Sequence, residues 1–87
     1  MTVLHNMKQH IIQNLCYTEL VYGRINKKLG TSYTRAEIEA LLFKVLEATD
    51  ESDYEKCGKN YYITNHDHGI RVTVNSNTWR VITVDGV

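Results

Sequence analysis

The chain has 87 residues, with ten Lys and Arg balanced by ten Asp and Glu, and 43% of its residues are hydrophobic. This length supports a single thin core, so we expect residues 1–87 to form one domain that holds no cofactor. Zero formal charge argues against a protein whose main task is to neutralise nucleic-acid phosphates, although it leaves a local basic patch open.

The expected location is the cytoplasm. Only Cys16 and Cys57 could form a disulfide, whereas small secreted domains usually carry several pairs. Polar side chains interrupt residues 1–13, so this segment lacks the apolar core of a signal peptide. No apolar run approaches the ~20 residues of a membrane span. We therefore expect reduced thiols and no membrane association.

Helical spacing dominates the first third of the chain. A first apolar stripe consists of Val3, Leu4, Met7, Ile11 and Leu15. A second stripe consists of Tyr17, Leu20, Val21, Ile25 and Leu29. Gly23 interrupts the second stripe, and the pattern fits either one kinked helix or two helices. Lys27 and Lys28 followed by Gly30 are typical of a helix C-terminus.

The next helix has the clearest start signal. Thr34 and Glu37 form a capping-box pattern directly ahead of an apolar helical stripe. That stripe consists of Ile38, Leu41, Leu42, Val45 and Leu46. The polar residues 49–53 then mark a break. The helical half is therefore expected over 1–48, with two to three helices.

From Tyr54 onward the apolar residues alternate, which predicts a four-stranded antiparallel β-meander over 54–87. The strands are expected at 54–57, 60–65, 70–74 and 79–84, with turns at 58–59, 66–69 and 75–78. A consistent register pairs Ile63 with Val72, Tyr61 with Val74, Val74 with Trp79, Val72 with Val81 and Ile70 with Thr83. The predicted fold class is α+β, with the helices on one face of the sheet.

The two faces of the predicted sheet differ in character. The inner face carries Tyr61, Ile63, Ile70, Val72, Val74, Trp79 and Val81. The outer face carries Glu55, Cys57, Tyr62, Thr64, Arg71, Thr73, Arg80, Ile82 and Val84. The last strand is expected to be an edge with no proline and little charge to protect it. Such edges pair with other chains, so we expect a homodimer or a protein partner.

Several segments resemble a family of small bacterial proteins of unknown function. The segments are Gly58-Lys59-Asn60-Tyr61-Tyr62, residues 70–76, Val81-Ile82-Thr83, and the upstream Thr18-Glu19-Leu20, Arg24-Ile25 and Leu29. The chain departs from that pattern at Tyr61, where Trp is common, and at Trp79-Arg80. The resemblance implies a recurrent domain and supplies no activity.

A second function class is RNA binding or RNA cleavage. Arg71, Arg80, Lys59 and Tyr62 are expected on the outer face, where cations can contact phosphates and a ring can stack on a base. The hairpin that carries the two arginines is similar to ribosome-dependent ribonuclease toxins of the RelE type. Those toxins are strongly basic, whereas this chain is neutral.

Metal and thiol chemistry have less support in the sequence. His66 and His68 are metal-capable side chains, but they lie in an expected turn and have no evident third ligand. Cys57 lies near Lys56 and Lys59, and reactive thiols occur in electropositive surroundings of this kind. Cys16 is expected to be a packing residue of the helical stripe. We assign no catalytic residue and no metal site.

The sequence therefore predicts a non-enzymatic protein-interaction or regulatory module that acts through its sheet face or edge. The surface assigned to a protein partner, or alternatively to RNA, consists of Lys59, Tyr62, Arg71, Thr73, Arg80 and Ile82.

Overall fold

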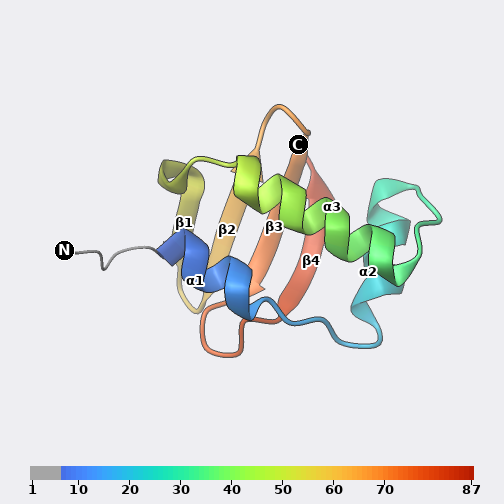
Figure 1. Ribbon diagram of the computed structural model, residues 1–87, viewed down its shortest axis with the longest axis horizontal. Helices are drawn as coiled ribbons and strands as arrows, with labels where there is room; N and C mark the ends of the chain where they lie inside the picture. Colours follow the sequence, from blue (N-terminus) through green and yellow to red (C-terminus); the bar gives the residue numbers. More distant parts are fainter. Residues whose placement is uncertain (1–6) are drawn as a thin grey trace.

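The computed structural model describes residues 7–87, and its elements follow the predicted order of helices first and strands second. The described elements are α1 (Met7–Asn14), α2 (Val21–Leu29), α3 (Arg35–Ala48), the 3₁₀ helix η1 (Glu51–Asp53), β1 (Tyr54–Cys57), β2 (Asn60–Asn65), β3 (Ile70–Asn75) and β4 (Val81–Gly86). The strands form one antiparallel sheet in the order β1-β2-β3-β4 (Figure 1). The predicted α+β class with a C-terminal meander is confirmed.

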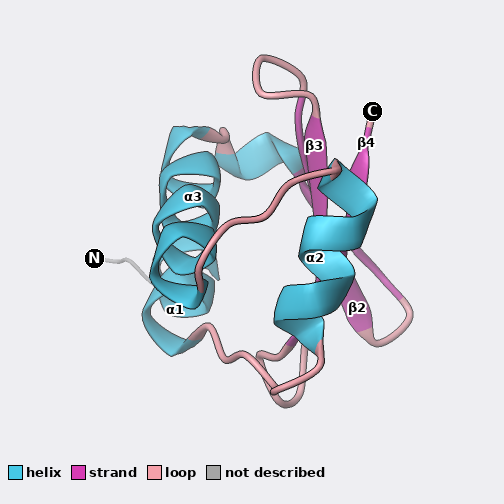
Figure 2. Cartoon of the chain, turned by 90° about the vertical axis from the view of Figure 1, so that its right-hand side faces the viewer, coloured by secondary structure: helices cyan, strands magenta, loops and turns pink. Residues whose placement is uncertain are grey.

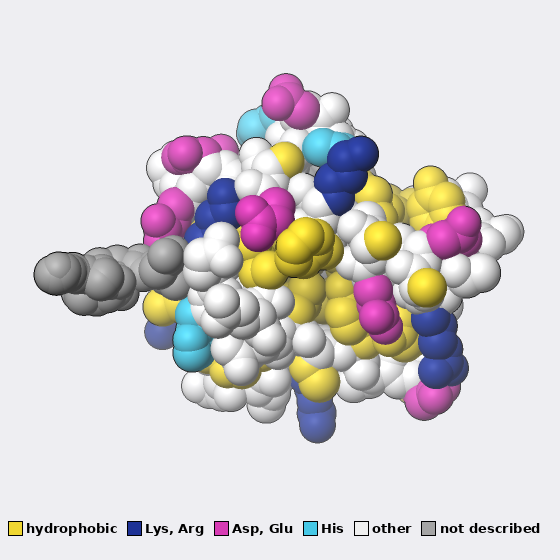
Figure 3. All heavy atoms as spheres, viewed as in Figure 1, with side chains coloured by type: hydrophobic (Ala, Val, Ile, Leu, Met, Phe, Trp, Pro, Cys, Tyr) yellow, Lys and Arg dark blue, Asp and Glu magenta, His cyan; other side chains and the backbone are white. Residues whose placement is uncertain are grey.

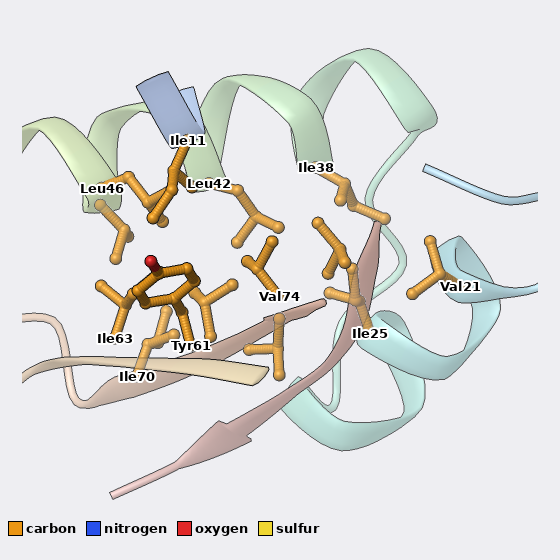
Figure 4. Packing of buried hydrophobic residues seen from close by; sticks show 14 residues of the cluster. Ile11, Val21, Ile25, Ile38, Leu42, Leu46, Tyr61, Ile63, Ile70 and Val74 are labelled. Carbon is orange, nitrogen blue, oxygen red and sulfur yellow. The ribbon is translucent and has the colours of Figure 1, made fainter. Parts of the chain in front are cut away.

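The helices and the sheet form two layers around one core. α1 and α3 lie over one face of the sheet, whereas α2 lies along β4 (Figure 2). Ile11 from α1 and Leu42 from α3 point toward Tyr61 and Val74 of the sheet (Figure 4). The buried hydrophobic residues are Ile11, Val21, Ile25, Ile38, Leu42, Val45, Leu46, Tyr61, Ile63, Ile70, Val72, Val74, Val81 and Val84.

Two helix ends follow the local sequence signals. Thr34 accepts a hydrogen bond from the Glu37 amide, and the Glu37 side chain accepts one from the Thr34 amide, so the predicted capping box is present. α2 ends at Gly30, whose φ of 69° is the left-handed conformation that glycine adopts without steric cost. α2 continues through Gly23 without a break.

The start of α2 corrects the predicted second stripe. Leu20 is the residue before α2 and is 82% exposed, so it does not belong to the buried face. The first and second stripes form separate helices, α1 and α2, which resolves the alternative left open by Gly23. Val3 and Leu4 of the first stripe lie outside the described residues.

The segment between α1 and α2 is extended because it pairs with the sheet. Cys16 forms a parallel β-bridge with Arg80: its amide donates to the Trp79 carbonyl over 2.8 Å, and its carbonyl accepts from the Val81 amide over 2.9 Å. Cys16 is exposed. The prediction that it packs as part of a helical stripe is therefore wrong, because a pairing with a residue 64 positions away overrides the local helical pattern.

The β2–β3 register is as predicted, and the β3–β4 register is not. Tyr61 pairs with Val74 and Ile63 with Val72. In contrast, Val74 pairs with Val81 instead of Trp79, and Val72 pairs with Val84 instead of Val81. Ile70 pairs with Gly86 rather than Thr83, and β4 runs over 81–86 rather than 79–84.

The loop after β3 causes this shift. The Asn75 side chain accepts hydrogen bonds from the amides of Asn77 and Thr78, and the Asn75 amide donates to the Arg80 carbonyl. The loop is therefore longer than two residues, and Trp79 ends it with a φ of 60°. Trp79 still packs on the core, with its ring stacked on Tyr61 at a centroid separation of 6.4 Å.

A β-bulge at Ile82 adds a further residue to the shift in register between β3 and β4. Thr73 pairs with Thr83 while Val74 pairs with Val81, so Ile82 is the extra residue on β4. Side chains after the bulge change faces relative to the prediction. Val84, expected on the outer face, is fully buried in the core.

Candidate functional site

The outer face of the sheet presents its side chains in rows across the strands. The central row places Glu55, Tyr62, Thr73 and Thr83 side by side on β1 to β4. A neighbouring row places Thr64, Arg71 and Asp85 on β2, β3 and β4. Within residues 7–87, α1 and α3 lie on the other side of the sheet and leave this face, here called the open face, uncovered (Figure 2). α2 borders the open face at β4, where Thr83 lines a hollow with α2 residues.

Tyr62 and Thr73 form the centre of the open face. They are cross-strand partners, and Tyr62 is half-buried while Thr73 is only 5% exposed. The expectation that Thr73 is an accessible contact residue is therefore wrong, because neighbouring side chains shield it. The Tyr62 hydroxyl accepts a long hydrogen bond of 3.5 Å from the Asn60 amide group. The centre of the open face therefore consists of the half-buried Tyr62 beside the nearly buried Thr73.

Arg71 is exposed at one end of this face, where charges of both signs meet. Its Nε donates to the Thr64 hydroxyl over 3.1 Å, and its cross-strand neighbour on β4 is Asp85. A hollow of about 200 Å³ beside it is lined by Ser52, Asp53, Glu55, Thr64, His66 and Arg71. Arg71 therefore lies among carboxylates rather than within a basic patch.

The remaining predicted site residues lie elsewhere. Lys59 is exposed in the β1–β2 turn, and its carbonyl accepts hydrogen bonds from the Ser76 amide and hydroxyl, which hold this turn against the β3–β4 loop. Arg80 and Ile82 line a hollow beside α2. The longer β3–β4 loop moves Arg80 to the level of Asn75, at the opposite end of β3 from Arg71. The two arginines do not form one site.

The edge of β4 is covered, which corrects the expectation of an unprotected edge. Cys16 pairs with the first part of the strand, and the Arg24 guanidinium donates to the Ile82 carbonyl over 3.4 Å. Further along, Lys28 forms an ion pair with Asp85 at 2.7 Å. Within residues 7–87, the free edge of the sheet is β1, a four-residue strand that carries Glu55 and Lys56.

A basic groove between α2 and β4 was not found by the sequence analysis. It has a volume of about 810 Å³ and is lined by Leu20, Gly23, Arg24, Lys27, Lys28 and Thr83. The spacing of Arg24, Lys27 and Lys28 places the three cations on one side of a helix, which the sequence does display. The groove itself depends on β4 lying beside α2, and no local pattern contains that information.

In the turn at 66–69, His68 contributes hydrogen bonds that stabilise the turn. Asn65, which ends β2 and is buried, accepts a hydrogen bond from the His68 amide over 2.8 Å. The His68 ring Nδ1 lies 3.2 Å from the same Asn65 oxygen. Within residues 7–87, no group of three or more His, Cys, Asp or Glu side chains is placed to hold a metal ion. Cys57 is an exposed free thiol.

Several polar contacts join α2 and the segment before it to α3. The Tyr22 hydroxyl donates to the Glu39 carboxylate over 2.6 Å, and this hydrogen bond raises the pKa of Tyr22 to about 12. The Arg35 guanidinium binds Glu19 and lies over the Tyr22 ring. Its hydrogen bond lowers the pKa of Glu19. These contacts fix the position of α2.

The helical side of the molecule differs from the open sheet face. Hydrophobic side chains lie between charged ones on this side (Figure 3). Phe43 is 54% exposed and belongs to α3, which lies on the other side of the sheet from the open face. It therefore offers a comparison site for experiments on the sheet.

Comparison with known proteins gives a family and no activity. Within the described residues, no helix has both the length and the apolar character needed to cross a bilayer. Neither the curated proteins nor the solved structures include a match to this chain. The expected resemblance to a family of unknown function is confirmed. The model of the protein family of unknown function DUF3781 matches residues 9–85, and the chain therefore belongs to that family.

Proposed function

We propose that the chain is a single-domain, non-enzymatic protein-interaction module that uses the open face of its sheet to pair with a second copy of itself. The observation that carries this proposal is the one-sided packing of the sheet: α1 and α3 cover the inner face, and the row that contains Tyr62 and Thr73 has no such cover (Figure 2). A sheet face that the helices leave uncovered and that has a central aromatic residue suits a protein partner.

The charges of the face favour self-pairing. Arg71 lies at one end with Glu55 beside the same hollow and Asp85 across the strand pair. A two-fold interface brings each surface onto an identical one, so a face that carries both signs can match Arg71 of one copy with Glu55 of the other. Zero net charge of the chain leaves little overall repulsion between copies.

The alternative of an RNA-binding or ribonuclease domain has less support. Arg71 faces Asp85, and Arg80 lies in the hollow beside α2, so the outer face lacks the cluster of cations that phosphate binding uses. If this alternative were correct, binding to single-stranded RNA would weaken steeply with salt and be lost in a variant combining Arg71→Ala and Arg80→Ala.

The proposed location is the cytoplasm. Cys16 and Cys57 are both free and exposed, and exposed free thiols persist in a reducing compartment. This property also favours keeping a reductant in every association experiment, because two exposed thiols can form an artificial disulfide-linked dimer.

Analytical ultracentrifugation of the full chain with reductant tests the proposal. We expect a concentration-dependent dimer in the micromolar range. Tyr62→Lys should weaken dimerisation by about tenfold or more, because it places a charge at the centre of the face. Phe43→Lys, which changes the helical side, should leave the dimer unchanged.

A charge exchange makes the test specific to the face. Arg71→Glu should weaken dimerisation, and adding Glu55→Arg to the same chain should restore it, since the pairs across the two-fold axis are then reversed together. A parent chain that sediments as a monomer at all concentrations would refute self-pairing. Equal effects of Tyr62→Lys and Phe43→Lys would refute the assignment of the face.

A further inference from the structure

The groove between α2 and β4 extends further than its main hollow. A second hollow of about 260 Å³ shares Leu20 and Arg24 with the main one and adds Arg80 and Ile82 to the lining. The two hollows therefore form one continuous surface, here named the α2–β4 groove. It follows α2, whose nine residues span about 13 Å.

The α2–β4 groove concentrates positive charge in a chain that is neutral overall. Arg24, Lys27, Lys28 and Arg80 line it, which is four of the ten basic residues. None of the described residues that line the two hollows is acidic. Asp85 binds Lys28 from outside the lining. The groove is therefore a local site of positive potential that attracts anionic groups.

Gly23 lies in the wall of this groove and is not required by the fold. It is inside α2, its φ is not positive, and a Cβ at this position would meet no atom within 4 Å. A glycine inside a helix nevertheless destabilises it. The absence of a side chain at Gly23 leaves the α2 backbone open to close approach by a molecule bound in the groove.

The groove also contains an apolar residue, Leu20, and a polar uncharged one, Thr83. Leu20 is the most exposed large hydrophobic residue among those described, and it borders both hollows. The Thr83 hydroxyl oxygen is buried and finds no hydrogen-bond partner within residues 7–87. Thr83 also lines the main hollow. The cations and Leu20 together would match a ligand that carries both a negative charge and an apolar group.

We propose that the α2–β4 groove binds an extended acidic segment of a partner protein, with carboxylates on Arg24, Lys27 and Arg80 and an aliphatic side chain on Leu20. An extended chain of about four residues spans the length of α2. Single-stranded RNA matches less well, because bases stack on aromatic side chains and no aromatic residue lines either hollow among the described residues.

Fluorescence anisotropy with the full chain tests this proposal. The probe is a fluorescein-labelled peptide that carries about four glutamates and one leucine. We expect saturable binding that weakens as salt is added. Combining Arg24→Glu with Lys27→Glu should weaken binding by about tenfold or more. The matched control combines Lys44→Glu with Lys56→Glu, which reverses two exposed cations away from the groove and should leave binding unchanged.

Gly23→Gln separates loss of the groove from loss of the fold. Glutamine favours the helix, so this variant should melt at a higher temperature than the parent while binding the peptide more weakly. Unfolding cannot produce this combination. Equal peptide binding by the parent and the Gly23→Gln and Arg24→Glu/Lys27→Glu variants would overturn the proposal, and so would tighter binding of an oligouridylate of the same charge.

The groove borders the open face of the sheet, because Thr83 lines the main hollow and also belongs to the central row of that face. The two sets of test substitutions change different residues and leave Thr83 intact, so the two proposals fail separately. Sedimentation of the Arg24→Glu/Lys27→Glu variant should give the same mass distribution as the parent. A peptide with leucine replaced by serine should bind less tightly than the original peptide, because it loses the contact with Leu20. Equal affinity of the two peptides would refute the apolar part of the groove.

Discussion

At the scale of single residues, two glycines with different backbone conformations predict opposite effects of the same substitution. Gly23→Ala should raise the free energy of unfolding by about 0.5–1 kcal/mol, because alanine favours the helix and its Cβ meets no neighbour. Gly30→Ala should lower it by about 1 kcal/mol, since the φ of 69° is costly for any residue with a Cβ. Urea denaturation of both variants measures the difference, and a shift of the same sign in both would contradict the explanation.

Trp79 has a backbone conformation that the sequence does not predict. Its β-propensity and apolar ring predict a strand position on the inner face. In the structure it has a φ of 60°, which is unusual for a bulky residue. The ring still reaches the core, with its edge contact to His10 at 4.9 Å and its stack on Tyr61. The apolar character was therefore read correctly, and the backbone conformation was not.

At the scale of the elements, what could be predicted depended on whether the signal was local. The capping box of α3, the glycine after α2 and the short turns at 58–59 and 66–69 all act within a few residues, and they placed these elements correctly. The β3–β4 loop also has a local cause, because the Asn75 side chain accepts hydrogen bonds within it. The sequence of residues 75–78 is compatible with either a two-residue turn or a longer loop, so the loop length could not be predicted.

The coverage of β4 could not be predicted, because its cause is non-local. Cys16 and Arg80 come together only when the chain between α1 and α2 lies along the sheet. This contact places Cys16 outside both helices and covers the edge of β4. The helical spacing around Cys16 and the apolar pattern of β4 predict neither result. The α2–β4 groove follows from this arrangement, so the sequence could indicate its cations but not their common site.

Hydrogen exchange measures the difference between the two edges of the sheet. The amides of Cys16 and Val81 donate to carbonyls over 2.8 and 2.9 Å, so both should exchange slowly. In the two-residue β1–β2 hairpin, Cys57 and Asn60 form the hydrogen-bonded pair, which leaves the Lys56 amide directed at the free edge. The Lys56 amide should exchange rapidly. Rapid exchange at Val81 would show that Cys16 does not cover β4 in solution.

At the scale of the whole molecule, the charged side chains are distributed unevenly, although the chain has no net charge. The cations gather along α2, and the open face of the sheet carries charges of both signs around Tyr62 and Thr73. The helices bury the other face completely at its centre, where Val72 and Val74 have no exposed area. Two chemically distinct surfaces on one small core are consistent with a protein that brings partners together.

The stability of the whole molecule should decline at alkaline pH because of two partly buried tyrosines, Tyr17 and Tyr54. Burial raises the pKa of both Tyr17 and Tyr54, and the Tyr54 hydroxyl donates to the Leu46 carbonyl over 2.6 Å. In the unfolded chain a tyrosine loses its proton near pH 10, whereas the folded chain retains these protons to higher pH. The unfolded state therefore binds fewer protons than the folded state above about pH 10, and stability is complete below that pH and falls as the pH rises.

Tyr54→Phe tests this origin of the alkaline decline. The variant should be less stable than the parent at neutral pH by about 1 kcal/mol, because it loses the hydrogen bond to Leu46. Above about pH 10 its free energy of unfolding should fall less steeply than that of the parent, since one proton fewer is released on unfolding. Urea denaturation at a series of pH values gives both curves. Parallel curves above this pH would mean that the pKa of Tyr54 is the same in the folded and unfolded states. The partial burial of Tyr54 against α3 would then be incorrect.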